Sequence, residues 1–295
     1  MLKRALFFTT PYSLSLKNNQ MVIKTREMPD IQKSIPIEDI GFVILEHQQT
    51  NITLPLLNAL SDNNVSVIFC GSNCMPNAML MNLDSNKTQG ESFRLQMEAS
   101  EPLKKNLWKQ IIEAKIRNQS ALLCKLGKDG DRLKPFYTNV KSGDNENREG
   151  AAARVYWTEL FGKDFVRSRE GNAPNNLLNY GYTLLRAAMA RALMGSGLLP
   201  AIGIFHRNRY NSFPLADDIM EPYRPYVDEI VYNLYFNGAR ELTKEVKAEI
   251  IHLLFTDTHF GNITRPLEIA LTSTSASLAK CFNGSVKKIV YPQLK

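Results

Sequence analysis

The sequence predicts an α+β protein in which a small N-terminal β-sheet domain, residues 1–85, precedes a larger all-α C-terminal domain, residues 86–295. Three observations predict this division. Strand-like apolar runs fill the first 80 or so residues, a polar turn-forming segment follows between about 80 and 92, and beyond it nearly every apolar pattern has helical spacing. A chain of 295 residues is long enough to bury a core in each domain.

The N-terminal domain is predicted to consist of strands and one helix. Its hairpin is expected at Asn18 and Asn19, because alternating runs flank this pair of turn residues. Residues 53–64 have helical spacing instead. We expect a structural or dimerising module built around one small sheet. The predicted strands are residues 4–10, the two arms of 13–25, 40–47 and 65–70.

The C-terminal domain is predicted to be helical. In residues 102–127 the apolar side chains recur every three or four positions and indicate a buried face, whereas the lysines favour a solvated one. Those lysines are Lys104, Lys105, Lys109 and Lys115. Further helices are predicted from a cap at Asp144, Asn145 or Asn147 to near Gly162, and from near Asn172, with Pro174 in the first turn, to Gly195 or Gly197. Others are predicted from about Val227, over 243–255, and from about Arg265 to Phe282.

Charge and cysteine content restrict the class of protein. The formal net charge is +7 and residues 1–85 carry six basic and seven acidic side chains, so the positive excess lies in residues 86–295 and indicates an acidic partner. Cys70 and Cys74 lack zinc-finger spacing, so we interpret them as reduced thiols of a cytoplasmic protein. No apolar run approaches membrane-spanning length, so no membrane partner is expected.

Glu149 is the first candidate for chemistry. It follows Asp144, Asn145 and Asn147, any of which would cap a helix that begins there. On such a helix Glu149 shares a face with alanines, and small side chains allow a nucleic acid strand to come close. The alternative is an ordinary first-turn acid that the helix dipole favours.

Residues 203–228 are the second candidate. Imidazole and carboxylate groups there suit Mg²⁺ or Mn²⁺, and guanidinium groups match phosphate oxygens, so metal-dependent phosphodiester chemistry is the first hypothesis. In the alternative, the histidine is an ordinary core or surface residue and Arg224 pairs with Glu221 or Asp228. The residues concerned are His206, Arg207, Arg209, Glu221 and Arg224.

Three further features are candidates for metal, phosphate or partner binding. Glu249 and His252 share a helix face with Glu245, as in di-iron bundles, but such sites need a second copy and two more glutamates that the sequence lacks, so a solvated or locally paired face is expected. Arg186 lies off the apolar stripe of its helix and faces either a phosphate or water. The basic tail, residues 286–295, is either a mobile end or a segment that pairs with a partner.

Four segments resemble the CRISPR-associated adaptation integrase, the protein family that inserts new spacers into CRISPR arrays. The segment at 203–225 ends in DD-x-x-EP-x-RP and is the most specific of them. The compact type II branch is the most similar, and the resemblance covers essentially the whole chain in order. The other segments are EGAAARVYW at 149–157, NNLLNYGY at 175–182, and the start at 7–23 together with 36–47.

The resemblance implies an N-terminal β-domain for dimerisation and partner docking and an α-helical catalytic and DNA-binding domain. It places the metal ligands, for Mg²⁺ or Mn²⁺, at Glu149, His206 and Glu221, with Asp218 as an auxiliary acid. It also implies a homodimer on double-stranded DNA, a heterohexamer with a small CRISPR-associated adaptation partner, and contacts with other type II CRISPR proteins. The implied DNA contacts are Arg186, Arg207, Arg209 and Arg224.

The implied reaction joins protospacer 3′-hydroxyls to the repeat boundaries by transesterification, as a metal-dependent DNA integrase and endonuclease. Exchange of one phosphodiester for another is nearly isoenergetic, and the sequence accordingly has no phosphate-binding loop for a nucleotide. One alternative is a metal-dependent nuclease that uses water as the nucleophile. The other is a DNA-binding scaffold, whose binding falls with salt but needs neither metal nor Glu149.

Overall fold

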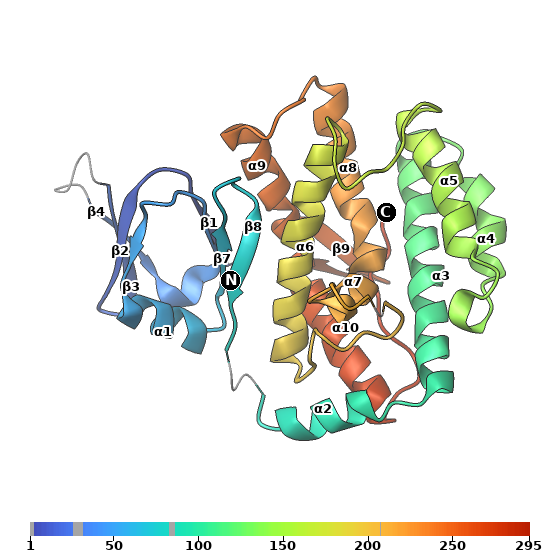
Figure 1. The fold of residues 1–295 in the computed structure, drawn as a ribbon, viewed down its shortest axis with the longest axis horizontal. Helices are drawn as coiled ribbons and strands as arrows, with labels where there is room; N and C mark the ends of the chain where they lie inside the picture. Colours follow the sequence, from blue (N-terminus) through green and yellow to red (C-terminus); the bar gives the residue numbers. More distant parts are fainter. Residues whose placement is uncertain (1–2, 26–31, 83–85, 207) are drawn as a thin grey trace. The chain divides into compact units, whose positions relative to one another are not determined.

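The computed structural model describes residues 3–25, 32–82, 86–206 and 208–295. The chain divides into two units, Met1–Ser85 and Asn86–Lys295 (Figure 1). The first unit consists of strands and a helix, and the second is mostly helical, so the predicted α+β class is confirmed. The second unit is not all-α, however, because a strand hairpin, β9 (Asp257–Phe260) and β10 (Ile263–Pro266), interrupts the helices.

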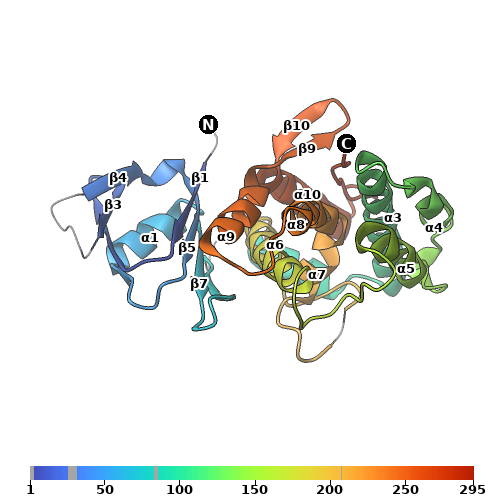
Figure 2. The same ribbon diagram turned by 90° about the horizontal axis from the view of Figure 1, so that it is seen from above.

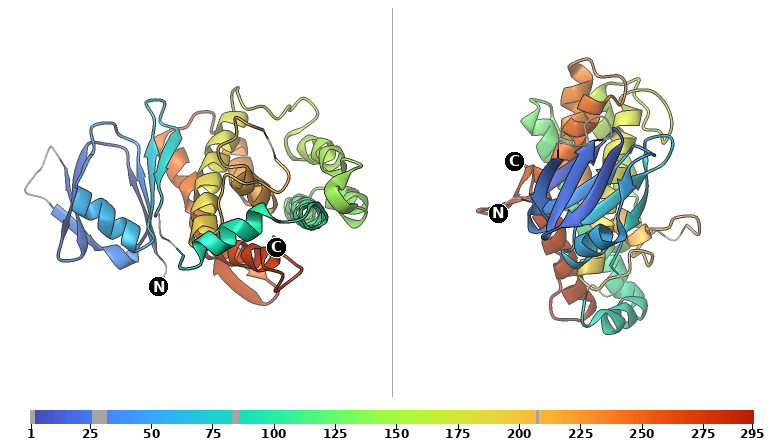
Figure 3. Two further views of the ribbon diagram at one scale, coloured as in Figure 1. Left: turned by 60° about the horizontal axis from the view of Figure 1, so that its bottom comes forward. Right: turned by 90° about the vertical axis from the view of Figure 1, so that its left-hand side faces the viewer.

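The described part of the first unit contains two four-stranded sheets, and Figure 3 shows their strands. One has the order β1-β5-β7-β8, in which the first three strands are parallel; the other has the order β4-β3-β2-β6. The strands are β1 (Arg4–Phe8), β2 (Tyr12–Lys17), β3 (Gln20–Thr25), β4 (Gln32–Pro36), β5 (Ile40–Leu45), β6 (Asn51–Ile52), β7 (Ser66–Cys70) and β8 (Pro76–Leu80).

The strands β4, β6 and β8 were not predicted, and a single sheet was expected. β4 and β8 are edge strands whose side chains are mostly exposed or half-buried, so they lack the alternation that marks a strand. The hairpin prediction is confirmed: Asn18 and Asn19 have φ of 51° and 56°, which a two-residue turn with both central residues at positive φ requires. Helix α1 (Leu54–Asp62) contacts strands of both sheets.

In the second unit, α6 packs against α7, α8 and α10 (Figures 1 and 2). The helices α3, α4 and α5 pack on one another, and α3 also contacts α7 and α8. Three predicted helix starts shift by a few residues. Arg265 belongs to β10, α6 begins after Pro174, and α8 begins at Arg224 instead of near Val227. No helix in the described ranges is long and apolar enough to cross a membrane. The helices are α2 (Gln89–Met97), α3 (Glu101–Lys125), α4 (Lys134–Thr138), α5 (Arg148–Phe161), α6 (Asn175–Gly195), α7 (Pro214–Met220), α8 (Arg224–Phe236), α9 (Lys244–Ile251) and α10 (Leu267–Phe282).

The C-terminal tail is held along α3 by side-chain amides. Gln110 donates to the Lys287 carbonyl at 3.0 Å and accepts from the Ile289 backbone N–H at 2.9 Å. Asn118 donates to the Pro292 carbonyl at 3.1 Å. Backbone groups of Lys287, Ile289 and Pro292 therefore have partners on α3, so within the single chain the structure shows a docked tail and not a mobile end.

Candidate functional site

Glu149 lies in the first turn of α5, where two side chains cap the helix. The Asp144 carboxylate accepts the backbone N–H groups of Arg148 at 2.8 Å and Glu149 at 3.0 Å. Asn147 Oδ1 accepts that of Gly150 at 3.1 Å. The predicted cap is thus confirmed at Asp144 and Asn147, and it fixes the backbone from which the Glu149 side chain projects.

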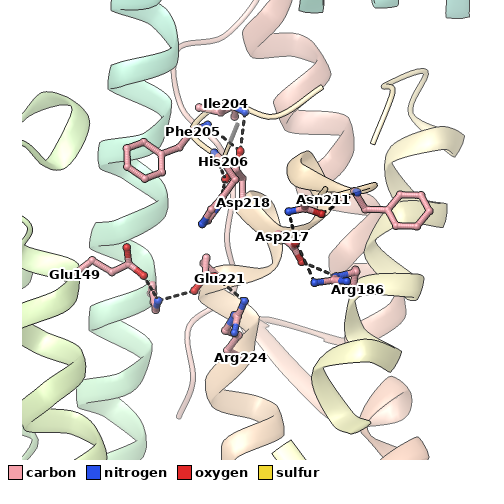
Figure 4. Close-up of polar contacts among 12 residues, drawn as sticks. Glu149, Arg186, Ile204, Phe205, His206, Asn211, Asp217, Asp218, Glu221 and Arg224 are labelled. Atoms are coloured by element: carbon pink, nitrogen blue, oxygen red, sulfur yellow. Dashed lines mark hydrogen bonds and ion pairs between the residues drawn. The ribbon is translucent and has the colours of Figure 1, made fainter. Parts of the chain in front are cut away.

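His206 belongs to a loop that the buried Asp218 of α7 organises. The Asp218 carboxylate is 0% exposed and accepts the backbone N–H groups of Ile204, Phe205 and His206 at 2.6, 2.9 and 3.2 Å. Its Oδ1 also lies 2.5 Å from His206 Nδ1 (Figure 4). A neutral imidazole that donates from Nδ1 keeps the lone pair of Nε2 for another group, as metal-binding histidines do.

Close packing on both sides holds this loop. A Cβ at Gly203 would lie 2.7 Å from the His206 carbonyl oxygen and 3.1 Å from Asp218 Oδ2, so only glycine allows the loop to approach α7. On the other side, Trp108 of α3 stacks on Phe205 with ring centroids 4.1 Å apart and meets the His206 ring edgewise at 5.7 Å. The orientation of the imidazole is therefore fixed by α3 and α7 together.

A lysine lies between the two predicted glutamate ligands. Lys115 Nζ of α3 is 2.5 Å from Glu149 Oε1 and 2.6 Å from Glu221 Oε2. Lys115 is 8% exposed and Glu221, in the 3-10 turn that follows α7, is 3% exposed. The prediction that Lys115 belongs to a solvated face is wrong, because the position one turn after Ile111 points to the interior of the unit.

Glu221 has a second cationic partner. Arg224 lies 2.9 Å from Glu221 Oε1, so the structure shows the ion-pair alternative for this arginine (Figure 4). Burial raises the pKa of Glu221, but Arg224 and Lys115 outweigh burial and the pKa is lowered. Burial lowers the pKa of Lys115, but Glu221 and Glu149 outweigh it and the pKa is raised. Glu221 and Lys115 therefore both favour their charged forms.

The other candidate arginines have different environments. Arg186 forms two hydrogen bonds to Asp217, at 2.6 and 3.1 Å, and its side chain remains 42% exposed. Arg209 is exposed and lies over the Tyr210 ring, 4.6 Å from its centroid. Arg207 lies outside the described residues. The structure thus leaves Arg186 and Arg209 accessible, whereas Arg224 is engaged within the site.

The described residues contain no group of three His, Cys, Asp or Glu side chains already arranged around one metal position. Neither the Glu249 and His252 pair nor Cys70 and Cys74 therefore belongs to such a group among the described residues. In the central site the carboxylates of Glu149 and Glu221 share one cation, the Lys115 ammonium, which shows that both can face a positive charge between them. The oxygens of Asp218 are occupied by four neighbours, so this residue orients His206 rather than offering a free ligand atom.

A buried carboxyl outside the proposed metal ligands, that of Asp228, predicts that the stability of the fold depends on pH. Asp228 is 1% exposed and accepts hydrogen bonds from Tyr156, at 2.6 Å, and from Tyr182. Burial raises the pKa of Asp228 to about 6 against the opposing effect of these hydroxyls. The folded protein therefore keeps a proton that the unfolded chain loses near pH 4, and stability falls as the pH rises from about 4 to 6.

Relative to Asp228→Asn, the free energy of unfolding of the wild-type protein is expected to fall by about 2 kcal/mol between pH 4 and pH 7. Denaturant unfolding of both proteins at several pH values measures this difference. Asparagine keeps the size of the side chain but does not titrate, so the other carboxylates cancel. A difference that stays constant over this range would mean that Asp228 has an ordinary pKa.

Three residues of α3 contact the candidate site in ways that the sequence did not predict. Trp108, Lys115 and Asn118 occur at spacings of seven and three, which places them on one helix face. Asn118 Nδ2 donates to the carbonyl of Pro222 at 2.8 Å as well as to that of Pro292, so the turn carrying Glu221 and the C-terminal tail meet at one amide. Polar side chains interrupting an apolar helix face were the signal that could have found them.

Comparisons with known proteins show which family the chain belongs to. The family model described as CRISPR associated protein Cas1 matches residues 6–258. A curated relative, CRISPR-associated endonuclease Cas1 of Neisseria meningitidis serogroup C (strain 8013), is 40% identical over 255 residues, which cover 85% of this chain and 83% of the relative. The chain belongs to the Cas1 family. The recognition made from the four sequence segments is therefore confirmed.

Two solved structures share the fold of this Cas1-family chain. A casposase bound to integration product has a TM-score of 0.79 and 22% identity, and the match covers 98% of this chain and 93% of the other. A chain of a Cas6-RT-Cas1–Cas2 complex has a TM-score of 0.73 and 20% identity, covering 100% of this chain and 37% of the other. At these identities the likeness shows the fold alone.

Proposed function

We propose that this chain is a metal-dependent DNA integrase and endonuclease of CRISPR adaptation, and that it belongs to the type II branch. It joins protospacer 3′-hydroxyl ends to the repeat boundaries by exchange of phosphodiester bonds. One observation carries the proposal. Glu149 and Glu221, from different parts of the chain, face a single positive charge beside a histidine whose Nε2 is left for another partner.

The donor set fits Mg²⁺ or Mn²⁺. Glu149, Glu221 and His206 Nε2 would hold the ion, since carboxylate oxygens and an imidazole nitrogen suit these metals, Mn²⁺ in particular. When bound, such an ion supplies charge stabilisation at the phosphate and lowers the pKa of the attacking hydroxyl. Asp218 would contact His206 and not the ion, and would hold the imidazole in the tautomer that leaves Nε2 unprotonated.

The rest of the site prepares these groups in advance. The cap at Asp144 fixes the backbone of Glu149, Trp108 and Asp218 fix the ring of His206, and Asn118 holds the turn of Glu221. Arg224 balances the charge of Glu221 inside the unit. Phosphoryl transfer depends mainly on such positioning and on charge stabilisation, so the reaction requires ligand side chains that are held rigidly in place.

The deciding experiment mixes the purified protein, with and without its small adaptation partner, with Mn²⁺, a labelled duplex bearing free 3′-hydroxyls and a supercoiled plasmid carrying a repeat. We expect label to become covalently joined to the plasmid. Glu149→Gln, which keeps the shape but removes the charge, should prevent joining, and so should chelation of the metal. The matched control is Glu159→Gln at the other end of α5, which should join like wild type.

Other products would favour the alternatives. Nicked plasmid without joined label would indicate a nuclease that uses water as the nucleophile. Tight DNA binding without any metal-dependent product would indicate a scaffold, and Glu149→Gln would then bind and behave like wild type.

A basic groove supports DNA as the partner. A cavity of about 570 Å³ lies between α3 and the C-terminal tail. Its lining carries four cationic side chains, Lys109, Arg117, Lys287 and Lys288, and one carboxylate, Glu113. The Lys287 and Lys288 side chains are exposed, whereas the tail is docked through the Lys287 carbonyl and its neighbours. The side chains are therefore available for phosphate groups while the backbone stays in place.

We expect Lys287→Gln/Lys288→Gln to weaken metal-free DNA binding and to reduce the slope of log affinity against log salt by about 2, one unit for each lost phosphate contact. Fluorescence anisotropy with a labelled duplex at several salt concentrations measures both. The control is Lys163→Gln/Lys244→Gln, which removes the same charge from exposed positions elsewhere in the unit. Equal losses in both double variants would show a general charge effect and no groove.

The partners of this chain are proposed from the family. A homodimer would bind protospacer and repeat duplexes, with the N-terminal unit serving dimerisation and docking. A small adaptation partner would bridge two dimers into a heterohexamer, and other type II CRISPR proteins would join it. In support, a chain of similar fold was solved as part of a Cas6-RT-Cas1–Cas2 complex. Size-exclusion chromatography with light scattering, with and without the small partner, tests the assembly.

A further inference from the structure

The Lys115 ammonium stands where the two glutamates would share a metal ion. It contacts Glu149 at 2.5 Å and Glu221 at 2.6 Å, and its side chain is 9% exposed. Every other lysine of α3 is more exposed than this one. A buried ammonium must be compensated by opposite charge, and here the compensation comes from the two carboxylates that the proposed function assigns to the metal.

We propose that Lys115 is a resident counter-ion that competes with the divalent cation for Glu149 and Glu221, and that DNA relieves this competition by offering a phosphate to the ammonium. The inference rests on the proposed function for the metal ligands. Lys115 thereby makes metal binding and DNA binding mutually dependent. The free protein binds the cation weakly, and the DNA complex binds it tightly.

The competition follows from charge. A divalent ion held by both carboxylates and an ammonium within 3 Å of the same oxygens repel each other strongly at low dielectric, so both cannot occupy the space. Arg224 adds a further positive charge beside Glu221 and increases this repulsion. The lysine must therefore withdraw when the metal binds, and its four-carbon stem allows the head group to move while the helix stays in place.

DNA supplies the alternative partner. A lysine ammonium is a compact point charge that binds phosphate oxygens, and a strand reaching the site brings one close to the carboxylates. The free energy that the ammonium loses by leaving the glutamates is then offset by the phosphate. By linkage, the metal must increase the affinity for DNA by the same factor as DNA increases the affinity for the metal.

The test is a Mn²⁺ titration followed by electron paramagnetic resonance, on free protein and on protein saturated with a short duplex, with duplex alone subtracted. Lys115→Met keeps the length of the stem and removes the charge. We expect it to bind Mn²⁺ at least ~10-fold more tightly than wild type without DNA. Duplex should tighten Mn²⁺ binding to wild type by a similar factor and to Lys115→Met by much less.

Three further proteins complete the design. Lys105→Met removes an exposed charge from the same helix and should titrate like wild type. Glu149→Gln should lose the tight Mn²⁺ site, which assigns the signal to this place. Lys115→Gln serves as a second neutral variant if Lys115→Met unfolds in a thermal melt, and it should show the same gain in affinity.

The outcomes separate the two proposals. Glu149-dependent Mn²⁺ binding that is unchanged or weaker in both neutral variants overturns the competition and leaves the proposed function in place. The absence of Glu149-dependent Mn²⁺ binding in wild type and variants, with or without duplex, overturns the metal assignment and this inference together. Joining of DNA by wild type in the plasmid experiment reports on the function independently of both.

Discussion

Replacing His206 by alanine is expected to abolish strand transfer, with a loss well above the roughly 100-fold that removal of an outer-shell partner of a metal ligand causes. The substitution removes the only imidazole among the three proposed ligands. The fold should survive, because the His206 side chain is 41% exposed and the loop backbone is held by Asp218 through three N–H groups. Joining of labelled duplex to plasmid, together with a thermal melt, measures both effects.

The matched control is His252→Ala. His252 is an exposed histidine at the end of α9, and its ring contacts Phe255. This variant should join DNA at the wild-type rate. A folded His206→Ala protein that still joins DNA would remove His206 from the site and leave the two glutamates without their proposed third ligand.

Replacing Asp218 by alanine is expected to lower the free energy of unfolding of the second unit by about 3–5 kcal/mol, because a buried donor without its acceptor costs about 1–3 kcal/mol. Three backbone N–H groups and the His206 ring would lose a partner at a position that is 0% exposed. Denaturant unfolding followed by tryptophan fluorescence reports on this unit, since Trp108 and Trp157 both lie in it.

Two comparisons make this result specific. Asp218→Asn keeps an acceptor but places an amide beside the backbone N–H groups, so its loss should be smaller than that of Asp218→Ala. Asp257→Ala removes an exposed carboxylate from β9 and should unfold within about 0.5 kcal/mol of wild type. If Asp218→Ala matched Asp257→Ala, the loop would not depend on this carboxylate, and the orienting role given to Asp218 would be wrong.

Part of the candidate site could be predicted from local sequence patterns. Glu149 was identified from its capped first turn, and His206 and Glu221 from one dense polar stretch, because each pattern lies within about 25 residues of sequence. The role of Arg224 was left between a phosphate contact and an ion pair. The structure shows the pair with Glu221 at 2.9 Å, a choice that depends on packing around a buried carboxylate.

The sequence by itself determined the two-part α+β organisation, the helices with clear apolar spacing, the Asn18-Asn19 hairpin and the family, since these depend on neighbours along the chain. Only the tertiary structure decided that Lys115 lies between Glu149 and Glu221, that Asp218 holds the His206 loop, and that Asn118 joins the Glu221 turn to the tail. These contacts join residues far apart in sequence. A polar side chain on a helix has the same local pattern whether it meets water or a buried partner, so burial had to come from the packed fold.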